Sequence, residues 1–315
     1  MNLFRSPEDQ VLVIGAANID VIGVLDETLQ NDTSNPAHIR FSFGGVARNV
    51  AENLARLGHP VKLITAVGND QFGAQLLQDA TDAGVNIDDI LCESDSVTGS
   101  YIGVVDAAGE LQFALDDMHL INSLNSQYLR DRYDAFKQAS LLFIDANIPK
   151  KTLRTVMSLA KRAKIPVFAD PATSLLAHRF IPYLSRFYLI TPNVNEAAIF
   201  CGREIDPSDP EQALEAAKYL VLQGVRIAII TLAEFGVCYA TSETSGYIPA
   251  IRTEIVDPTG GGDALTAAVI FALLNDIPLD DAVRLGVSAA SLTLRHRGAV
   301  LPDLSLEKLY DQLVI

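Results

Sequence analysis

The residues with the clearest chemistry are three consecutive glycines followed by an aspartate, Gly260 to Asp263. They lead into Ala264 to Phe271, which is apolar on every face and predicts a buried helix. Without side chains in the way, the free N–H groups and the positive end of the helix dipole can approach an anion closely. The segment therefore predicts a phosphate site. A glycine turn with Asp263 as a simple helix cap is the alternative.

The two common nucleotide-binding loops do not occur in this sequence. The Walker pattern GxxxxGK[ST] is absent and none of the eight lysines lies in a glycine-rich loop, which excludes P-loop chemistry. A GxGxxG loop after a strand is also missing, which argues against a nicotinamide or flavin enzyme. A second glycine pair, Gly44-Gly45, opens an amphipathic helix and offers a second place for close approach of a ligand to the backbone.

Strands and helices alternate around these loops. Short apolar runs predict strands at 11–17, 61–67, 141–145, 166–170, 188–191 and 226–231. Amphipathic or apolar runs of greater length predict helices at 46–57, 72–83, 150–164, 193–201 and 210–223. Strands separated by helices of this length indicate an α/β fold with a mostly parallel sheet covered by helices on both faces.

Four short strands break this rhythm and predict a small β layer. They lie at 21–24, 39–43, 100–106 and 110–115, and the last two flank a turn typical of hairpins. We expect a core of residues 1–17, 44–98 and 117–315, and a β lid of residues 18–43 and 99–116. The β layer is expected to close over a site or to form an interface, and a surface hairpin without function is the alternative.

Charge and composition exclude several classes of partner. The 315 residues carry a formal charge of −15, which repels nucleic acid and anionic membranes. The longest apolar run is about half the ~20 residues that a membrane span needs. Three scattered cysteines form no disulfide framework and five histidines show no zinc-ligand spacing, so we expect a cytoplasmic protein without a zinc site.

Five segments, in this order, resemble the motifs of the ribokinase-like, or PfkB-type, sugar and nucleoside kinases. These segments are Asn18 to Asp20, Gly44 to Asn49, Pro192 to Glu196, Thr231 to Gly236 and Asp257 to Asp263. The resemblance covers essentially the whole chain and is greatest to the pseudouridine-phosphorylating branch of the family. It implies a ribokinase-like fold and transfer of the ATP γ-phosphoryl group to the 5′-hydroxyl of pseudouridine.

The resemblance also implies roles for individual residues. Asp263 would be the catalytic base, with a low pKa at its helix N-terminus, and Gly260, Gly261 and Gly262 would form the anion hole. The nucleoside would be held by Asn18, Asp20, Gly44, Gly45, Asn49 and Asn147. Ser100 and Tyr101, at the start of a lid strand, are expected to help choose the substrate. Arg48 is assigned no role, because a solvated helix face and a substrate contact are both open.

The nucleotide side of the site follows in the same way. Asn193, Thr231 and Gly236 would contact ATP, Glu196 would hold Mg²⁺ through water, and Asp257 would support a monovalent cation such as K⁺. The Asn193-x-x-Glu196 pattern also predicts a helix capping box, and both interpretations can hold together.

Two further classes of function stay open. A kinase of the ribokinase, adenosine kinase or fructokinase type would act on another nucleoside or a free sugar. A nucleoside-binding sensor would keep the fold without the chemistry. Exposed edges of the lid strands offer a surface for a homodimer.

Overall fold

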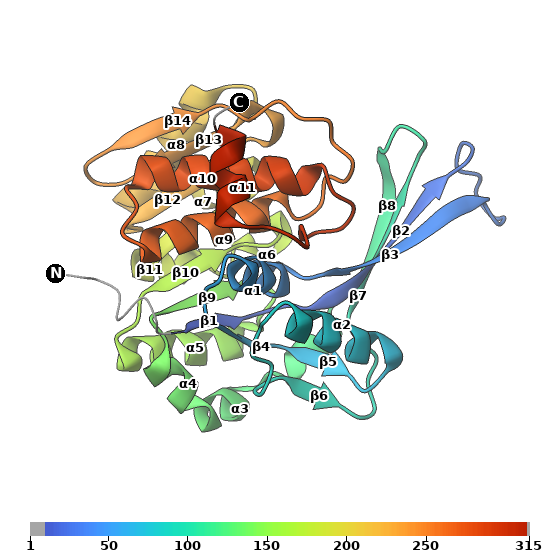
Figure 1. Cartoon of the computed structure of the whole chain (residues 1–315), viewed down its shortest axis with the longest axis horizontal. Helices are drawn as coiled ribbons and strands as arrows, with labels where there is room; N and C mark the ends of the chain where they lie inside the picture. Colours follow the sequence, from blue (N-terminus) through green and yellow to red (C-terminus); the bar gives the residue numbers. More distant parts are fainter. Residues whose placement is uncertain (1–9, 314–315) are drawn as a thin grey trace.

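The computed structural model describes residues 10–313; the first nine residues of the predicted core and residues 314–315 lie outside the described part. An eight-stranded sheet forms the centre of the molecule, in the order β14-β13-β12-β11-β10-β9-β1-β4 (Figure 1). Its six strands from β12 to β4 run parallel, and β13 and β14 are antiparallel at one edge. The predicted α/β class with a mostly parallel sheet is confirmed.

The strands of this sheet are short and largely buried. They are β1 (Val11–Ile14), β4 (Val61–Ile64), β9 (Leu141–Asp145), β10 (Val167–Asp170), β11 (Phe187–Ile190), β12 (Ile227–Thr231), β13 (Val237–Ala240) and β14 (Ser245–Ile248). The apolar run at 61–67 was expected to be one strand, which is wrong. It divides at the buried Thr65, because β5 (Ala66–Gly68) leaves the main sheet and pairs with β6 (Leu91–Glu93).

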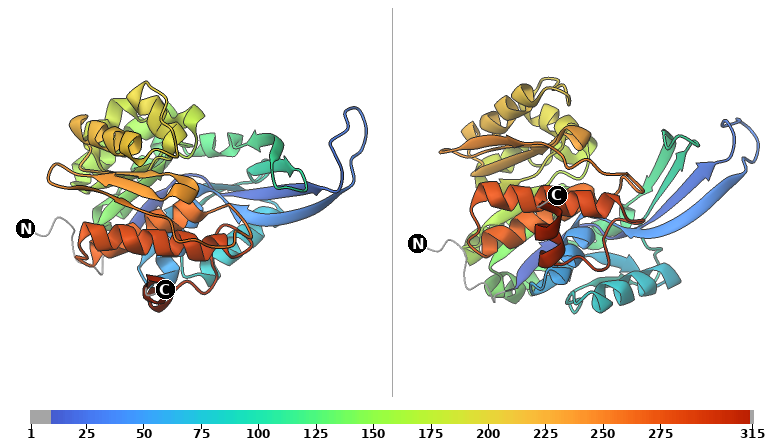
Figure 2. Two further views of the ribbon diagram at one scale, coloured as in Figure 1. Left: turned by 90° about the horizontal axis from the view of Figure 1, so that it is seen from above. Right: turned by 45° about the horizontal axis from the view of Figure 1, so that its top comes forward.

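Helices cover both faces of the sheet, as Figures 1 and 2 show. One face carries α3 (Ser126–Asp131), α4 (Tyr133–Gln138), α5 (Lys150–Ala163), α6 (Ser174–Ala177), α7 (Val194–Cys201) and α8 (Pro210–Leu222). The other carries α1 (Val46–Arg56), α9 (Gly261–Leu274) and α10 (Leu279–Leu294), with α11 (Leu306–Leu313) outside α10 and α2 (Gln71–Asp82) beside β5. Three short 3₁₀ segments complete the described elements: η1 (His119–Ser123), η2 (Ile181–Arg186) and η3 (Ala233–Phe235).

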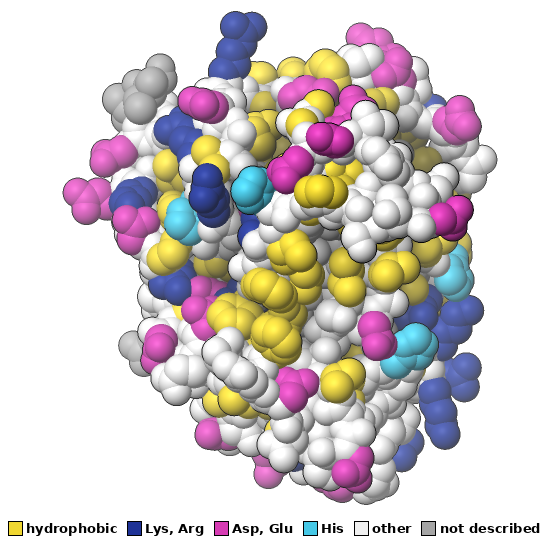
Figure 3. Space-filling view, turned by 90° about the vertical axis from the view of Figure 1, so that its right-hand side faces the viewer, with side chains coloured by type: hydrophobic (Ala, Val, Ile, Leu, Met, Phe, Trp, Pro, Cys, Tyr) yellow, Lys and Arg dark blue, Asp and Glu magenta, His cyan; other side chains and the backbone are white. Residues whose placement is uncertain are grey.

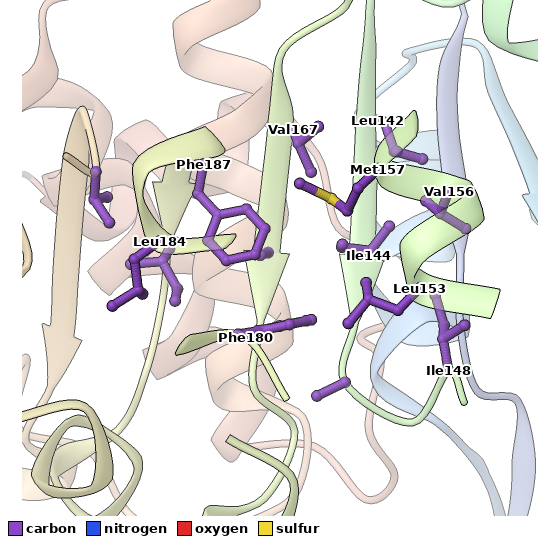
Figure 4. Close-up of a cluster of buried hydrophobic side chains, with 14 of the residues drawn as sticks. Leu142, Ile144, Ile148, Leu153, Val156, Met157, Val167, Phe180, Leu184 and Phe187 are labelled. Atoms are coloured by element: carbon purple, nitrogen blue, oxygen red, sulfur yellow. The ribbon is translucent and has the colours of Figure 1, made fainter. Parts of the chain in front are cut away.

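Two hydrophobic layers hold this arrangement together. On one face, Leu142 and Ile144 of β9 pack against Val156 and Met157 of α5, and Phe187 continues the layer, all without exposure above 1% (Figure 4). The layer on the other face joins the sheet to α1, α9 and α10. Burial of this kind contributes roughly 1.5–3 kcal/mol for each large side chain. The sheet is therefore a rigid platform, and the loops at its carboxyl edge are fixed in position.

A separate four-stranded sheet projects from the platform, in the order β3-β2-β7-β8. It consists of β2 (Asn18–Leu25), β3 (Ala37–Gly44), β7 (Ser100–Val105) and β8 (Leu111–Asp117), so the four predicted strands form and join one sheet. In Figures 1 and 2 it extends beyond the helices at one end of the molecule. Its two halves come from distant parts of the chain and are joined by the parallel pairing of β2 with β7.

Within residues 10–313, no helix is long and apolar enough to cross a membrane.

Candidate active site

The predicted phosphate loop forms the start of helix α9. Gly260 is the N-cap, with φ +77°, and a Cβ at this position would lie 1.9 Å from the carbonyl oxygen of Ala299. Only glycine fits there without strain. A Cβ on Gly262 would meet no atom within 4 Å, and the first N–H groups of a helix have no partner inside it. The first turn of α9 therefore offers unpaired donors beside open space.

A cleft of about 950 Å³ opens beside this helix end. Its walls include Gly261 and Gly262 together with the three residues expected to contact a nucleotide, Asn193, Thr231 and Gly236. The ends of neighbouring strands bring these residues together, because Asn193 and Thr231 are paired by a parallel β-bridge. The cleft thus combines a helix N-terminus with a cavity large enough for a small-molecule ligand.

Asp263, in the first turn of α9, is not part of the cleft wall. Its Oδ2 accepts a hydrogen bond of 2.7 Å from Nδ2 of Asn49, at the start of α1. Burial, and after it the charges of Asp170, Asp145 and Asp20, raise the pKa of Asp263 well above its usual value. The expectation of a low pKa at the helix N-terminus is wrong, because burial and three neighbouring carboxylates outweigh the helix dipole and the Asn49 bond.

The expected sugar ligands gather where β2 begins. Nδ2 of Asn18 donates to Oδ1 of Asp20 at 2.7 Å, and burial raises the pKa of Asp20 to about 6. A Cβ on Gly44 would lie 2.2 Å from Oδ2 of Asp20, and one on Gly45, whose φ is +95°, would lie 2.4 Å from the carbonyl oxygen of Ala16. The two glycines therefore leave space for the carboxylate of Asp20 and the carbonyl oxygen of Ala16, which are groups of the protein itself.

Asp145, at the end of β9, accepts hydrogen bonds from three backbone segments of this region. It was not singled out from the sequence. It is fully buried, and its Oδ2 accepts from the N–H groups of Ala16 at 2.8 Å and Ala47 at 3.1 Å. Its Oδ1 accepts from the N–H of Asn147 at 2.9 Å, which places that predicted ligand at the same strand end. A carboxylate closing a wholly apolar strand was the available signal, since a buried charge must be paired or bonded.

Two more carboxylates stand at the neighbouring strand ends. Glu196 and Asn193 exchange hydrogen bonds of 2.8 and 3.0 Å, so the predicted capping box is confirmed. Burial, and then the charge of Asp170, raise the pKa of Glu196 to about 8. Burial also raises the pKa of Asp170 to about 7, although Thr191 Oγ1 lies 3.2 Å from its Oδ2. Asp170 was not foreseen, because only the strand order brings it to Glu196 and Asp263.

Crowded carboxylates suit a hard cation with oxygen ligands. In the described part of the chain no three acidic, histidine or cysteine side chains are grouped closely enough to form a complete metal cage. Mg²⁺ does not need such a cage, because it keeps several waters and shares phosphate oxygens with a substrate. Glu196 and Asp170 are the residues whose position fits such an ion.

Asp257 supports the loop that leads to Gly260. Its Oδ1 accepts from the N–H of Thr259 at 3.1 Å and from its Oγ1 at 2.6 Å, while Oδ2 accepts from the N–H of Gly298 at 3.2 Å. The guanidinium of Arg40, on β3, lies 3.6 Å from the same Oδ2. Both oxygens are therefore engaged by the chain, and the monovalent cation expected here stays a prediction.

Arg48 is neither on a solvated helix face nor open to a ligand, because only 3% of its side chain is exposed. Its guanidinium forms ion pairs with Glu52 and Asp79. Nη1 donates to the carbonyl oxygen of Phe43 at 3.3 Å and to Oδ1 of Asn49 at 3.1 Å. The arginine thus joins α1 to α2 and orients the amide that reaches Asp263.

The strand register separates the two residues expected to choose the substrate. Tyr101 pairs with Asp20, so its side chain shares the face of the four-stranded sheet that carries Asp20. Ser100 pairs with Ile19, which is buried against Val67 below that sheet. Ser100 therefore lies on the opposite face from Asp20.

The chain is similar in sequence to known proteins. The family described as pfkB family carbohydrate kinase matches residues 8–305. The pseudouridine kinase of Escherichia coli strain K12 is 33% identical over 300 residues, which cover 95% of each chain. The ribokinase of Haemophilus influenzae is 27% identical, covering 91% of this chain and 92% of that protein.

A solved structure shows the same fold. It is that of a putative Ribokinase II from E. coli in complex with ATP and Mg²⁺, which superposes with a TM-score of 0.83 and covers 97% of this chain and 99% of that one. Its sequence identity to this chain is 18%.

Proposed function

The chain belongs to the pfkB family of carbohydrate kinases, and we propose that it transfers the γ-phosphoryl group of ATP to the 5′-hydroxyl of pseudouridine. The observation that carries the choice of substrate is the 33% identity to a pseudouridine kinase over 95% of both chains. The geometry supports the reaction class, because the first turn of α9, whose N–H groups have no partner inside the helix, carries Asp263 and borders a cleft of about 950 Å³ through Gly261 and Gly262.

In this proposal the two sides of α9 have different tasks. ATP lies in the cleft against Asn193, Thr231 and Gly236, with its terminal phosphate directed at Gly260–Gly262. The nucleoside lies on the side of Asn49, where the carboxylate of Asp20 accepts hydrogen bonds from the ribose hydroxyls and the amide of Asn18 lies beside it, bonded to Asp20. Gly44, Gly45 and Asn147 shape this second pocket. The two ligands thus approach the start of α9 from different sides, and the substrate hydroxyl and the γ-phosphorus meet in front of Asp263.

Asp263 orients the hydroxyl and accepts its proton. A carboxylate in water is a weak base, but burial and nearby carboxylates raise the pKa of this one and so improve its affinity for a proton. Asn49 holds the carboxylate in place through the 2.7 Å hydrogen bond, and Arg48 fixes Asn49 in turn. The backbone donors of the anion hole stabilise charge on the transferring group, where positioning dominates in a loose transition state.

The proposed metal site follows from the same carboxylates. Mg²⁺ bound to ATP would neutralise charge on the phosphate oxygens, with Glu196 and Asp170 holding it through water. The chain places no lysine in its glycine loops, so beside the metal the phosphate charge is offset by the backbone donors of the anion hole and by Arg252 of the cleft wall. The proposal therefore makes transfer strictly dependent on the metal.

The four-stranded sheet would act as a lid over the nucleoside, with Tyr101 on its inner face. Closure excludes water, which competes with the substrate hydroxyl for ATP.

The outer face of the four-stranded sheet exposes apolar side chains, among them Ile39, Phe41, Phe113 and Leu115, and Figure 3 shows hydrophobic side chains gathered on this end of the molecule. We propose that two copies pair through this face, and Leu115→Glu should then convert a dimer into a monomer in light scattering.

The test of the proposed function is a panel of pseudouridine, uridine, adenosine, ribose and fructose with ATP and Mg²⁺. The expected result is phosphorylation of pseudouridine with a kcat/KM well above that of the other compounds. Transfer to a free sugar or another nucleoside alone would reject the substrate and keep the kinase. Tight nucleoside binding without any ATP turnover would favour a sensor.

A further inference from the structure

One row of polar side chains crosses the inner face of the four-stranded sheet. In the register, Ser42 of β3 pairs with Asp20 of β2, Asp20 with Tyr101 of β7, and Tyr101 with Asp116 of β8. Directly paired residues point to the same face of a sheet. The four side chains therefore stand side by side, from one edge of the sheet to the other.

This face of the sheet is turned toward the start of α9. Arg40, two residues before Ser42 on β3 and so on the same face, reaches Asp257 at 3.6 Å. A Cβ on Gly298 would lie 4.0 Å from Cβ of Ser42. The inner face therefore looks onto the anion-hole loop, and a substrate in front of Asp263 would lie beneath the row.

The two members of the row beyond Asp20 differ in their surroundings. A Cβ on Gly103 would lie 3.1 Å from Cε1 of Tyr101, so the tyrosine side chain leans along β7 toward this glycine. Asp116 is exposed, and its charge is among the causes, after burial and the charge of Asp20, that raise the pKa of the neighbouring Tyr101. Its neighbour Asp117 lies on the outer face, and its Oδ1 lies 2.8 Å from Nδ1 of His119.

The spacing of the two carboxylates matches a nucleoside. Neighbouring strands are about 4.8 Å apart, so Asp116 lies about 10 Å across the sheet from Asp20, with Tyr101 between them. A ribose bound at Asp20 would direct its base along the row, over the ring of Tyr101 and toward Asp116. A carboxylate only accepts hydrogen bonds, so Asp116 requires a donor on the far edge of that base.

We propose that Asp116 accepts a hydrogen bond from N1–H of the base and thereby selects pseudouridine over uridine, an inference that rests on the proposed function. In pseudouridine the ribose is attached to C5, which leaves N1–H free on the ring edge. In uridine N1 carries the ribose, and a C–H group stands in the corresponding position. A carboxylate that loses water without gaining a donor strongly disfavours the second nucleoside.

The experiment compares Asp116→Ala with Asp117→Ala, which removes the same charge one residue away on the opposite face. For Asp116→Ala we expect kcat/KM to fall about 10- to 100-fold with pseudouridine. With uridine it should stay within about twofold of the wild type, because no hydrogen bond is lost. Asp117→Ala should change neither value, and Asp116→Asn, which keeps an acceptor oxygen, should retain part of the selectivity.

Two results would overturn the inference. Equal loss with both nucleosides in Asp116→Ala would give the residue a general role in the sheet, and no change with either nucleoside would remove it from recognition of the base. Either result, with pseudouridine still phosphorylated by the wild type, leaves the proposed function standing. A wild-type protein that does not phosphorylate pseudouridine rejects both proposals at once.

Discussion

Two alanine substitutions in the glycine loop, at Gly262 and at Gly260, should distinguish a loss of activity from a loss of stability. Gly262→Ala adds a Cβ that meets no protein atom within 4 Å, so no clash is expected. In the first turn of α9 alanine is favoured over glycine by about 0.5–1 kcal/mol, so the free energy of unfolding should stay the same or rise slightly. The same methyl group would occupy the space beside the free N–H groups, where the phosphoryl group is proposed to pass.

The expected loss of activity is large. Removing one donor from an oxyanion hole typically lowers kcat by about 10²–10³, and obstruction of the approach to Gly262 should have an effect of this size. Gly260→Ala is the contrasting variant, because its φ of +77° alone costs about 1–2 kcal/mol for alanine. The contact of 1.9 Å with the carbonyl oxygen of Ala299 adds to that cost.

Both variants are measured by urea unfolding and by kcat with the best nucleoside of the panel. We expect Gly262→Ala to be inactive and stable, and Gly260→Ala to be destabilised by at least about 2 kcal/mol. Wild-type turnover in Gly262→Ala would refute the anion hole. A stable Gly260→Ala variant would refute the argument from the left-handed cap.

Four further outcomes follow from the site. Asp263→Asn should lower kcat by about 10²–10⁴ while the nucleoside Kd from calorimetry stays within a few-fold, because an amide oxygen can still accept from Asn49. Burial and the charge of Asp170 raise the pKa of Glu196 to about 8, so the folded ligand-free protein keeps a proton that the unfolded chain loses above its ordinary pKa of 4.5. The free energy of unfolding should therefore fall as the pH rises from 4.5 to about 8, and urea titrations of Glu196→Gln should show a smaller slope. Arg48→Ala leaves the buried carboxylate of Glu52 with one ion-pair partner, Arg56, in place of two and should cost about 3 kcal/mol in chemical unfolding, whereas loss of stability below about 1 kcal/mol would contradict the buried ion pair. Excess chelator should abolish phosphate transfer, and substantial transfer without free divalent cations would show that the metal is dispensable.

The sequence was sufficient for those features that depend on neighbours along the chain. Strand and helix periodicity predicted the α/β class, and three glycines before an apolar run predicted the start of the buried helix α9. The capping box of Asn193 and Glu196 was visible because its two residues are three positions apart. Such features are local, so the residue types and their spacing determine them directly.

The sequence could not reveal the contacts that the strand order creates. Asp145 and Asp170 each look like the polar end of one strand, and only the adjacency of β9 and β10 crowds them against Asp263 and raises its pKa. The division of the run at 61–67 escaped prediction for the same reason, because β5 pairs with a strand more than twenty residues further along the chain.

Arg48 illustrates the difference most clearly. Along the chain it is a charged residue in an amphipathic helix, a place where solvent exposure is the ordinary expectation. In the folded protein α2 brings Asp79 to it, and together with Glu52 this makes burial of the guanidinium possible. The sequence by itself thus determined the class of fold and the place of the glycine loop at the start of α9. Tertiary structure decided which charges meet there, because charges are buried or exposed according to partners that lie far away in the chain.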